Sequence, residues 1–110
     1  MNYPILTLGA QSVHEAVTRL QFSLATERAR GEEFLRVDFA TDGADTVRLR
    51  GAVLRALRER KRQGKIRFFL PSEDFSSEKP EAAFIANKYP ALLSDGALLA
   101  GANSYIFIRL

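Results

Sequence analysis

Short apolar runs alternate along this chain with two longer segments in which apolar residues recur every three or four positions. The short runs are rich in leucine, β-branched and aromatic residues, which is typical of strands. They are residues 3–8, 34–41, 65–70 and 105–110. The longer segments, 12–30 and 46–63, have the periodicity of amphipathic helices. Strand, helix, strand, helix and strand with short links predict an α/β fold with right-handed crossovers and some parallel pairing.

The ends and faces of both helices can be predicted from individual residues. Ser12 and Glu15 have capping-box spacing at the start of the first helix, and Gly31 is suited to end that helix in a left-handed conformation. Gly64 is expected to stop the second helix. Phe22 lies opposite the apolar stripe of the first helix, so we expect it to be exposed or to need a second contact. The predicted inward residues are Val13, Val17, Leu20 and Leu24 in the first helix, and Leu49, Val53, Ala56 and Leu57 in the second.

The chain between the third and the last strand has a weaker pattern. Residues 72–80 are polar and rich in turn formers, and Pro80 is suited to the first turn of a short helix that ends near Lys88, before Tyr89 and Pro90. Residues 91–102 are expected to be irregular or to form one helical turn. We interpret 1–110 as a single domain with an insertion at about 72–102, which is either a lid or padding for the core.

The composition excludes several classes of function. There is no cysteine, so a disulfide framework and a thiolate metal site are impossible. His14 is the sole histidine, and we expect neither a metal site nor a cofactor. The N-terminus does not resemble a signal peptide, and no apolar run approaches the roughly 18 residues of a membrane span. We therefore expect a cytoplasmic protein without a membrane partner.

Positive charge is concentrated in the second helix and the link after it. Nine of the sixteen lysines and arginines lie between Arg48 and Arg67, with one acid, Glu59, among them. On a helical wheel Arg48, Arg55, Arg58 and Arg62 fall within roughly 80° of one another, away from the apolar arc. Such a face could bind the phosphates of DNA or RNA, or it could be a solvated face paired with acids such as Glu73. The candidate nucleic-acid-binding residues are Arg48, Arg50, Arg55, Arg58, Arg62, Lys65 and Arg67.

Several segments together resemble the small MutS-related (Smr) family. That family has a strand of Leu-Asp-Leu-His-Gly type and a helix start of Thr/Ser-Val-x-Glu-Ala type, to which residues 6–10 (LTLGA) and 12–16 (SVHEA) are similar. Its second landmark is a His-Gly-x-Gly motif before a helix that begins near Leu-Arg-x-Ala-Val. Residues 49–53 (LRGAV) match this helix start. Counting back from them without a gap aligns residues 42–45 (DGAD) with the His-Gly-x-Gly motif. Residues 101–110 resemble the family's closing Gly-x-Thr-Ile-Val-x-Leu.

The resemblance implies a two-layer α/β sandwich with a mixed sheet, similar to the C-terminal domain of translation initiation factor three. It also implies nucleic-acid binding, with endonuclease activity in some members. The polar positions differ, however. Gly9 replaces the first-strand histidine, Thr7 the aspartate before it, and Asp42 the histidine of His-Gly-x-Gly, so that Gly43 alone is retained. We therefore expect a non-catalytic nucleic-acid-binding module, in which Gly9, Asp42, Gly43 and Asp45 mark the family-motif loops.

Two alternative functions remain open. In one, Asp42 and Asp45 hold a divalent metal for residual endonuclease activity, although we expect these acids to form the turn and cap the helix. In the other, the chain is a protein-interaction or scaffold domain, or a homodimer, with Phe22 or the apolar residues 97–100 at the interface. His14 is expected at the surface.

The aromatic residues are concentrated in the second half of the chain. Single-strand-binding proteins stack bases on such side chains, but small cores use the same residues for packing, and packing is the interpretation that we favour. Phe75 and Tyr89 are exceptions, because their expected loop positions make them candidates for a surface role.

Overall fold

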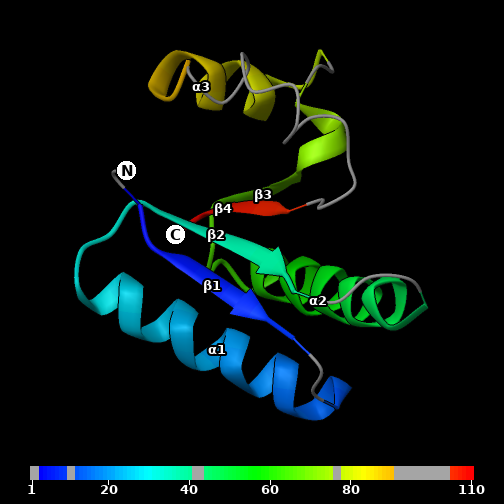
Figure 1. Ribbon diagram of the computed structural model, residues 1–110. Coiled ribbons are helices and arrows are strands. Elements are labelled where there is room, and N and C mark those ends of the chain that lie inside the picture. Colours follow the sequence, from blue (N-terminus) through cyan, green and yellow to red (C-terminus); the bar gives the residue numbers. More distant parts are fainter. Residues whose placement is uncertain (1–2, 10–11, 41–43, 76–77, 91–104) are drawn as a thin grey trace.

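The computed structural model describes residues 3–9, 12–40, 44–75, 78–90 and 105–110, which form one mixed sheet and three α-helices. Figure 1 shows their arrangement. In chain order the elements are β1 (Ile5–Leu8), α1 (Val13–Ala29), β2 (Phe34–Phe39), α2 (Ala44–Arg62), β3 (Phe68–Pro71), the 3₁₀ turn η1 (Ser72–Asp74), α3 (Pro80–Lys88) and β4 (Ile106–Arg109). The predicted α/β class and order of elements are thereby confirmed.

The four strands have the order β1-β2-β4-β3. β1 and β2 are parallel, with Leu6 opposite Val37, whereas β4 is antiparallel to both of its neighbours. The last strand therefore lies inside the sheet, between β2 and β3. A parallel pair joined through α1 and antiparallel pairs at β4 together make the mixed sheet that the sequence predicts.

The helices α1 and α2 form one layer against one face of the sheet, while α3 and η1 lie over the opposite face (Figure 1). Because side chains alternate along a strand, β2, β3 and β4 contribute to two separate apolar clusters, whereas β1 contributes to the first one only. The first cluster, between the sheet and α1/α2, contains Leu6, Leu8, Leu35, Val37, Ile106 and Ile108 with Leu20, Leu24, Leu49, Val53 and Leu57. The second, beneath η1 and α3, contains Phe34, Phe68, Leu70, Tyr105 and Phe107 with Phe75, Ala82 and Ile85.

The predicted helix caps are present. The Ser12 hydroxyl oxygen accepts a hydrogen bond from the Glu15 amide at 3.1 Å. At the other end of α1, Gly31 has φ +78°, and the amides of Gly31 and Glu32 donate to two carbonyls of the last turn. This is the Schellman arrangement, which satisfies carbonyls that the helix itself leaves without a donor.

The second helix ends in the same way. Gly64 has φ +73°, its amide donates to the Lys61 carbonyl, and the Lys65 amide donates to the Arg60 carbonyl at 2.9 Å. Because Lys65 completes the helix end, β3 begins at Phe68 and not at Lys65 as predicted. The first bond to β4 comes from the Arg67 amide to the Arg109 carbonyl, at 2.8 Å.

Four other details differ from the sequence-based expectations. β2 ends at Phe39, before the predicted limit, and α2 begins at Ala44, two residues early. On α1 the buried line is Ala16, Leu20 and Leu24, whereas Val13 and Val17, which the sequence predicts to point inward, are only half-buried. Phe75, expected at the surface, is 4% exposed because η1 turns it into the second cluster.

The residues that the structure describes at 72–75 and 78–90 pack on the sheet through Phe75, Ala82 and Ile85, so this part of the insertion is core padding. The expectations for residues 91–102, the apolar 97–100 segment included, lie outside the described residues. Among the described helices, none is both long and apolar enough to cross a membrane.

Candidate nucleic-acid interface

The candidate interface is built on the outward face of α2. Leu49, Val53 and Leu57 are at most 2% exposed and fix which side of the helix meets the sheet. The four arginines of the predicted face lie on the other side and are all exposed; they are Arg48, Arg55, Arg58 and Arg62. The prediction that these four arginines point away from the core is therefore confirmed.

Two of these arginines form ion pairs within the helix. Arg48 contacts Asp45 at 3.1 Å, and Arg62 contacts Glu59 at 2.6 Å, each three residues away. The hydrogen bond from Arg62 lowers the pKa of the Glu59 carboxyl, and Glu59 in turn raises the pKa of Arg62. Exposed pairs of this kind are screened by water, so a phosphate can compete for either arginine.

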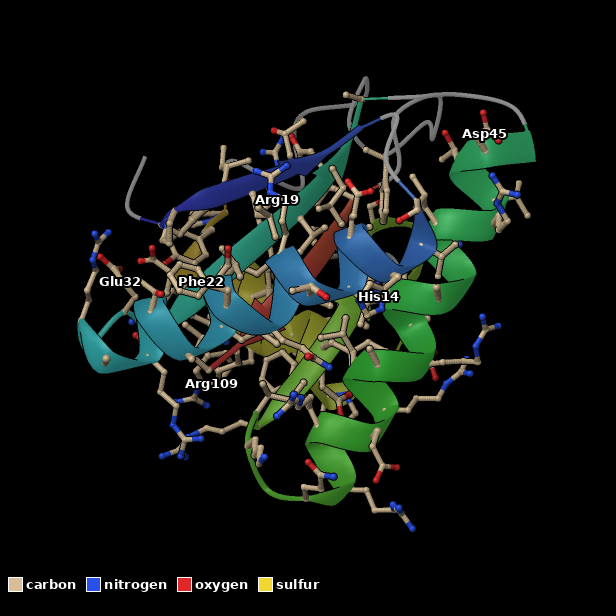
Figure 2. All side chains as sticks on the ribbon, turned by 90° about the horizontal axis from the view of Figure 1, so that it is seen from below. His14, Arg19, Phe22, Glu32, Asp45 and Arg109 are labelled. Atoms are coloured by element: carbon tan, nitrogen blue, oxygen red, sulfur yellow. The ribbon has the colours of Figure 1, made fainter. Side chains whose placement is uncertain are left out.

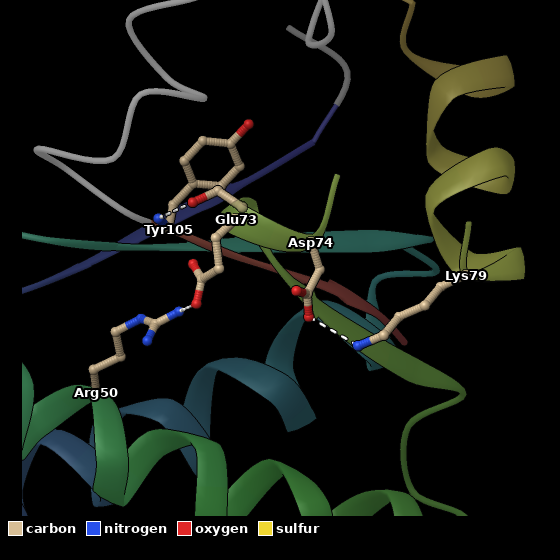
Figure 3. Close-up of polar contacts among 6 residues, drawn as sticks. Arg50, Glu73, Asp74, Lys79 and Tyr105 are labelled. Carbon is tan, nitrogen blue, oxygen red and sulfur yellow. Dashed lines mark hydrogen bonds and ion pairs between the residues drawn. The ribbon is translucent and has the colours of Figure 1, made fainter. Parts of the chain in front are cut away.

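Arg50 has a different role from the outward arginines. Its guanidinium pairs with Glu73 of η1, and its side chain is only 22% exposed (Figure 3). Figure 3 also shows Lys79 paired with Asp74, the next residue of η1. Arg50 therefore ties α2 to the turn after β3, which is the pairing with Glu73 that the solvated-face interpretation predicts.

The remaining candidates are Arg55, Arg58, Lys65 and Arg67, which form no ion pair within the described ranges. All four are exposed. Arg55 and Arg58 are one turn apart at the centre of the outward face, between the two paired arginines. Arg58 also lines a groove of about 470 Å³ between α2 and the β3–η1 segment, together with Lys61 and Lys79.

A second hollow, which we call the α1–α2 cleft, lies between the C-terminal halves of the two helices and has a volume of about 420 Å³. Its lining includes Lys65, one of the predicted residues, but also Arg28 and Arg60, which the sequence-based set omits. Both arginines lie in the last turn of a helix, where basic residues are usual because they complement the helix dipole. Sequence alone offers no sign that the two turns meet.

The family-motif residues are not brought together as a catalytic site by the part of the chain that the structure describes. Gly9 follows β1, and a Cβ at this position would lie 3.8 Å from the Ala40 Cβ, an ordinary contact. Asp42 and Gly43 are outside the described residues. Asp45 lies inside the first turn of α2 and not at its N-cap, because the helix begins at Ala44; it pairs there with Arg48 (Figure 2).

No group of three or more acids or histidines that could hold a metal exists within the described ranges. His14 is exposed on the first turn of α1, as expected (Figure 2). Most of the aromatic residues of the second half pack together beneath η1 and α3, with ring centroids 5.5–6.2 Å apart. Tyr89 is half-buried among them, so its candidacy for a surface role receives no support.

The fold and the site define an α/β domain with a four-stranded mixed sheet and a cationic helix surface. Comparisons with protein-family models, with curated proteins and with solved structures find no match to this chain. The resemblance to the Smr family therefore stays a prediction from the sequence.

Proposed function

We propose that this chain is a non-catalytic nucleic-acid-binding module that contacts the phosphate backbone through α2 and the link after it. The observation that carries the proposal is the state of Arg55 and Arg58. Both are exposed, adjacent on the outward face, and have no acidic partner within the described residues. Arginines that are not neutralised by an acid of the protein can replace the counterions around a nucleic acid, and the release of these counterions favours binding.

The surrounding charges support the same interpretation. Lys65 and Arg67 extend the positive surface beyond the end of α2. Arg48 and Arg62 flank the centre of the outward face, and a phosphate can replace the acid that pairs with each of them. Contacts from such cations are to phosphates and carry no information about base sequence. The proposed binding is therefore to DNA or RNA without strong sequence preference.

The test is a fluorescence anisotropy titration with short DNA and RNA at 50 and 200 mM salt. With four phosphate contacts, the affinity for duplex DNA should fall on the order of 100-fold between these concentrations. Reversing the charge of Arg55 and Arg58 together should weaken binding at low salt and reduce the slope of log affinity against log salt by about two.

A matched control reverses two basic residues elsewhere, Arg19→Glu on α1 with Lys88→Glu on α3. This variant has the same net charge as the Arg55→Glu/Arg58→Glu protein but keeps the face of α2. We expect it to retain most of the affinity. Negligible binding of all probes at 50 mM salt, or equal losses in the two double variants, would contradict the proposal.

Phe22 favours a second candidate function, a protein-interaction domain. Its side chain is 73% exposed on the outer side of α1, and it is the one aromatic among the large apolar side chains that are exposed in the described part of the chain (Figure 2). If two copies associate through this residue, sedimentation should show a dimer that Phe22→Ser dissociates. A monomer at all concentrations would exclude the homodimer.

A further inference from the structure

The α1–α2 cleft combines an apolar floor with a basic rim. Leu24 and Ile66 are at most 7% exposed at its base, and Ala25 on α1 forms one wall. The charged residues around it are Arg28, Arg60 and Lys65, and none of the described residues that line this cleft is an acid. If the cleft were only the gap between two solvated helix ends, it would not need an apolar base.

The two helix ends hold this rim in place. Gly31 and Gly64 reverse the chain after α1 and α2, and Arg28 donates from Nη1 to the Lys65 carbonyl at 2.8 Å. This bond crosses from one helix end to the other and fixes one edge of the Arg28 guanidinium. The remaining guanidinium donors and the Lys65 ammonium are left for another group.

A second hollow of about 380 Å³ adjoins the cleft, since both are lined by Arg28, Lys65 and Ile66. It adds Arg67, and Glu32 is the one acid among its described lining residues. Glu32 lies at the end of α1 (Figure 2). The two hollows are therefore adjacent, and basic residues line both of them around the α2–β3 link, at one end of the molecule.

We propose that the α1–α2 cleft receives an unpaired nucleotide of a single-stranded nucleic acid. The base lies on Leu24, Ala25 and Ile66 beside the Arg28 and Arg60 guanidiniums, and the flanking phosphates lie at Lys65 and Arg67. The cleft's volume is in the range of small-molecule sites, and arginine planes stack on bases as aromatic rings do. A duplex cannot place a base in the cleft, because its bases are stacked inside a convex surface of phosphates.

This inference rests on the proposed function, but it concerns a different surface. The outward face of α2 contacts phosphates of either a duplex or a single strand, whereas the cleft distinguishes between the two. Helix dipoles alone would also favour basic residues in both last turns. That explanation predicts no loss of binding when the cleft is filled without any change of charge.

The test uses the full chain with a 12-residue oligothymidylate and a 12-base-pair duplex, both measured by anisotropy at 50 mM salt. Ala25→Trp fills the cleft from an exposed helix position, and Ala83→Trp on α3 is its control. We expect Ala25→Trp to weaken binding of the single strand about tenfold and to change duplex binding less than twofold. The control should change neither.

Arg60→Glu provides a second variant, because Arg60 has no ion pair within the described residues and its replacement leaves the helix intact. It should likewise weaken the single strand more than the duplex. The inference is overturned if both cleft variants bind the single strand like the wild type while Arg55→Glu/Arg58→Glu does not. Failure of the wild type to bind either probe overturns the proposed function itself.

Discussion

Two of the four arginines on the outward face of α2 are paired with an acid one turn away, whereas the central two have no acidic partner among the residues that the structure describes. The helical wheel identifies the face correctly, because it depends only on the angle between successive residues. It cannot identify the pairing, which depends on rotamers and on acids from other elements. Arg50 illustrates the difference, since its partner Glu73 is distant in sequence and comes into reach only when β3 is placed.

The ion pairs of Glu33 likewise form with residues that are distant in the sequence. Its carboxylate pairs with Lys88 of α3 and lies 3.4 Å from Arg109 of β4. The hydrogen bond from Lys88 lowers the pKa of Glu33. Partial desolvation opposes this shift, and the positive charges of Lys88 and Arg109 add to it. A carboxyl with a lowered pKa in the folded state stabilises the fold above its unfolded pKa and loses that effect as pH falls through the folded value.

We therefore predict that Glu33→Gln lowers the free energy of unfolding at pH 7 by a few tenths of a kcal/mol, a small amount because the pair is partly exposed. The difference from the wild type should shrink as pH falls below about 4.3, the ordinary pKa of a glutamate, and should be lost once Glu33 is protonated in the folded protein as well. Urea denaturation at several pH values measures it. Glu32→Gln is the control, and a Glu33 effect that persists undiminished at pH 2 would contradict the assignment.

At the scale of elements, the helix ends are the best-predicted features of the fold. Ser12, Gly31 and Gly64 take the roles that their chemistry predicts, because caps are local and involve few residues. Strand limits are less well predicted. Lys65 has strand-like neighbours but serves as the last part of the α2 cap, and Phe75 is buried by η1, a 3₁₀ turn that no periodicity indicates.

The two glycines of the α2 region should respond in opposite ways to alanine. Gly64→Ala should destabilise the protein by about 1 kcal/mol, because its φ of +73° strains any residue with a Cβ even though nothing lies within 4 Å. Gly51→Ala should stabilise it by about 0.5–1 kcal/mol, since Gly51 is inside the helix and the new Cβ would meet only Arg55 Nη1, at 3.7 Å.

Thermal or urea unfolding of both variants tests this contrast. Equal signs for the two substitutions would show that helix propensity and backbone strain are not the dominant effects here. Because Gly64 also forms part of the cap beside the α1–α2 cleft, the measurement should be made before any binding experiment with that variant.

At the scale of the whole molecule, the sheet is shared by two apolar clusters. Phe107 and Ile108 of β4 point to opposite faces, so the last strand contributes to the layer under α1 and α2 and to the layer under α3. The sequence predicts the alternating pattern of this strand but not its position between β2 and β3. That position depends on the pairing of β4 with β2 on one side and with β3 on the other, and no local pattern encodes such long-range pairing.

A shared sheet implies that both layers unfold in one cooperative transition. All three tyrosines belong to the second cluster or pack against it, while most of the helix content is in α1 and α2 on the other face. Tyrosine fluorescence and far-ultraviolet circular dichroism therefore report mainly on different layers. We predict that their urea transitions coincide, as they do for a two-state domain.

Ile85→Ala provides the decisive test, because Ile85 belongs to α3 and is 1% exposed. If α3 is part of the cooperative unit, the substitution should lower the free energy of unfolding by about 2–5 kcal/mol in both signals and leave the denaturant slope unchanged. Leu57→Ala on α2 should do the same, whereas Asn87→Ala at an exposed position of α3 should have little effect. A loss confined to tyrosine fluorescence would instead mean that α3 unfolds independently, and that the layer carrying α2 is stable without it.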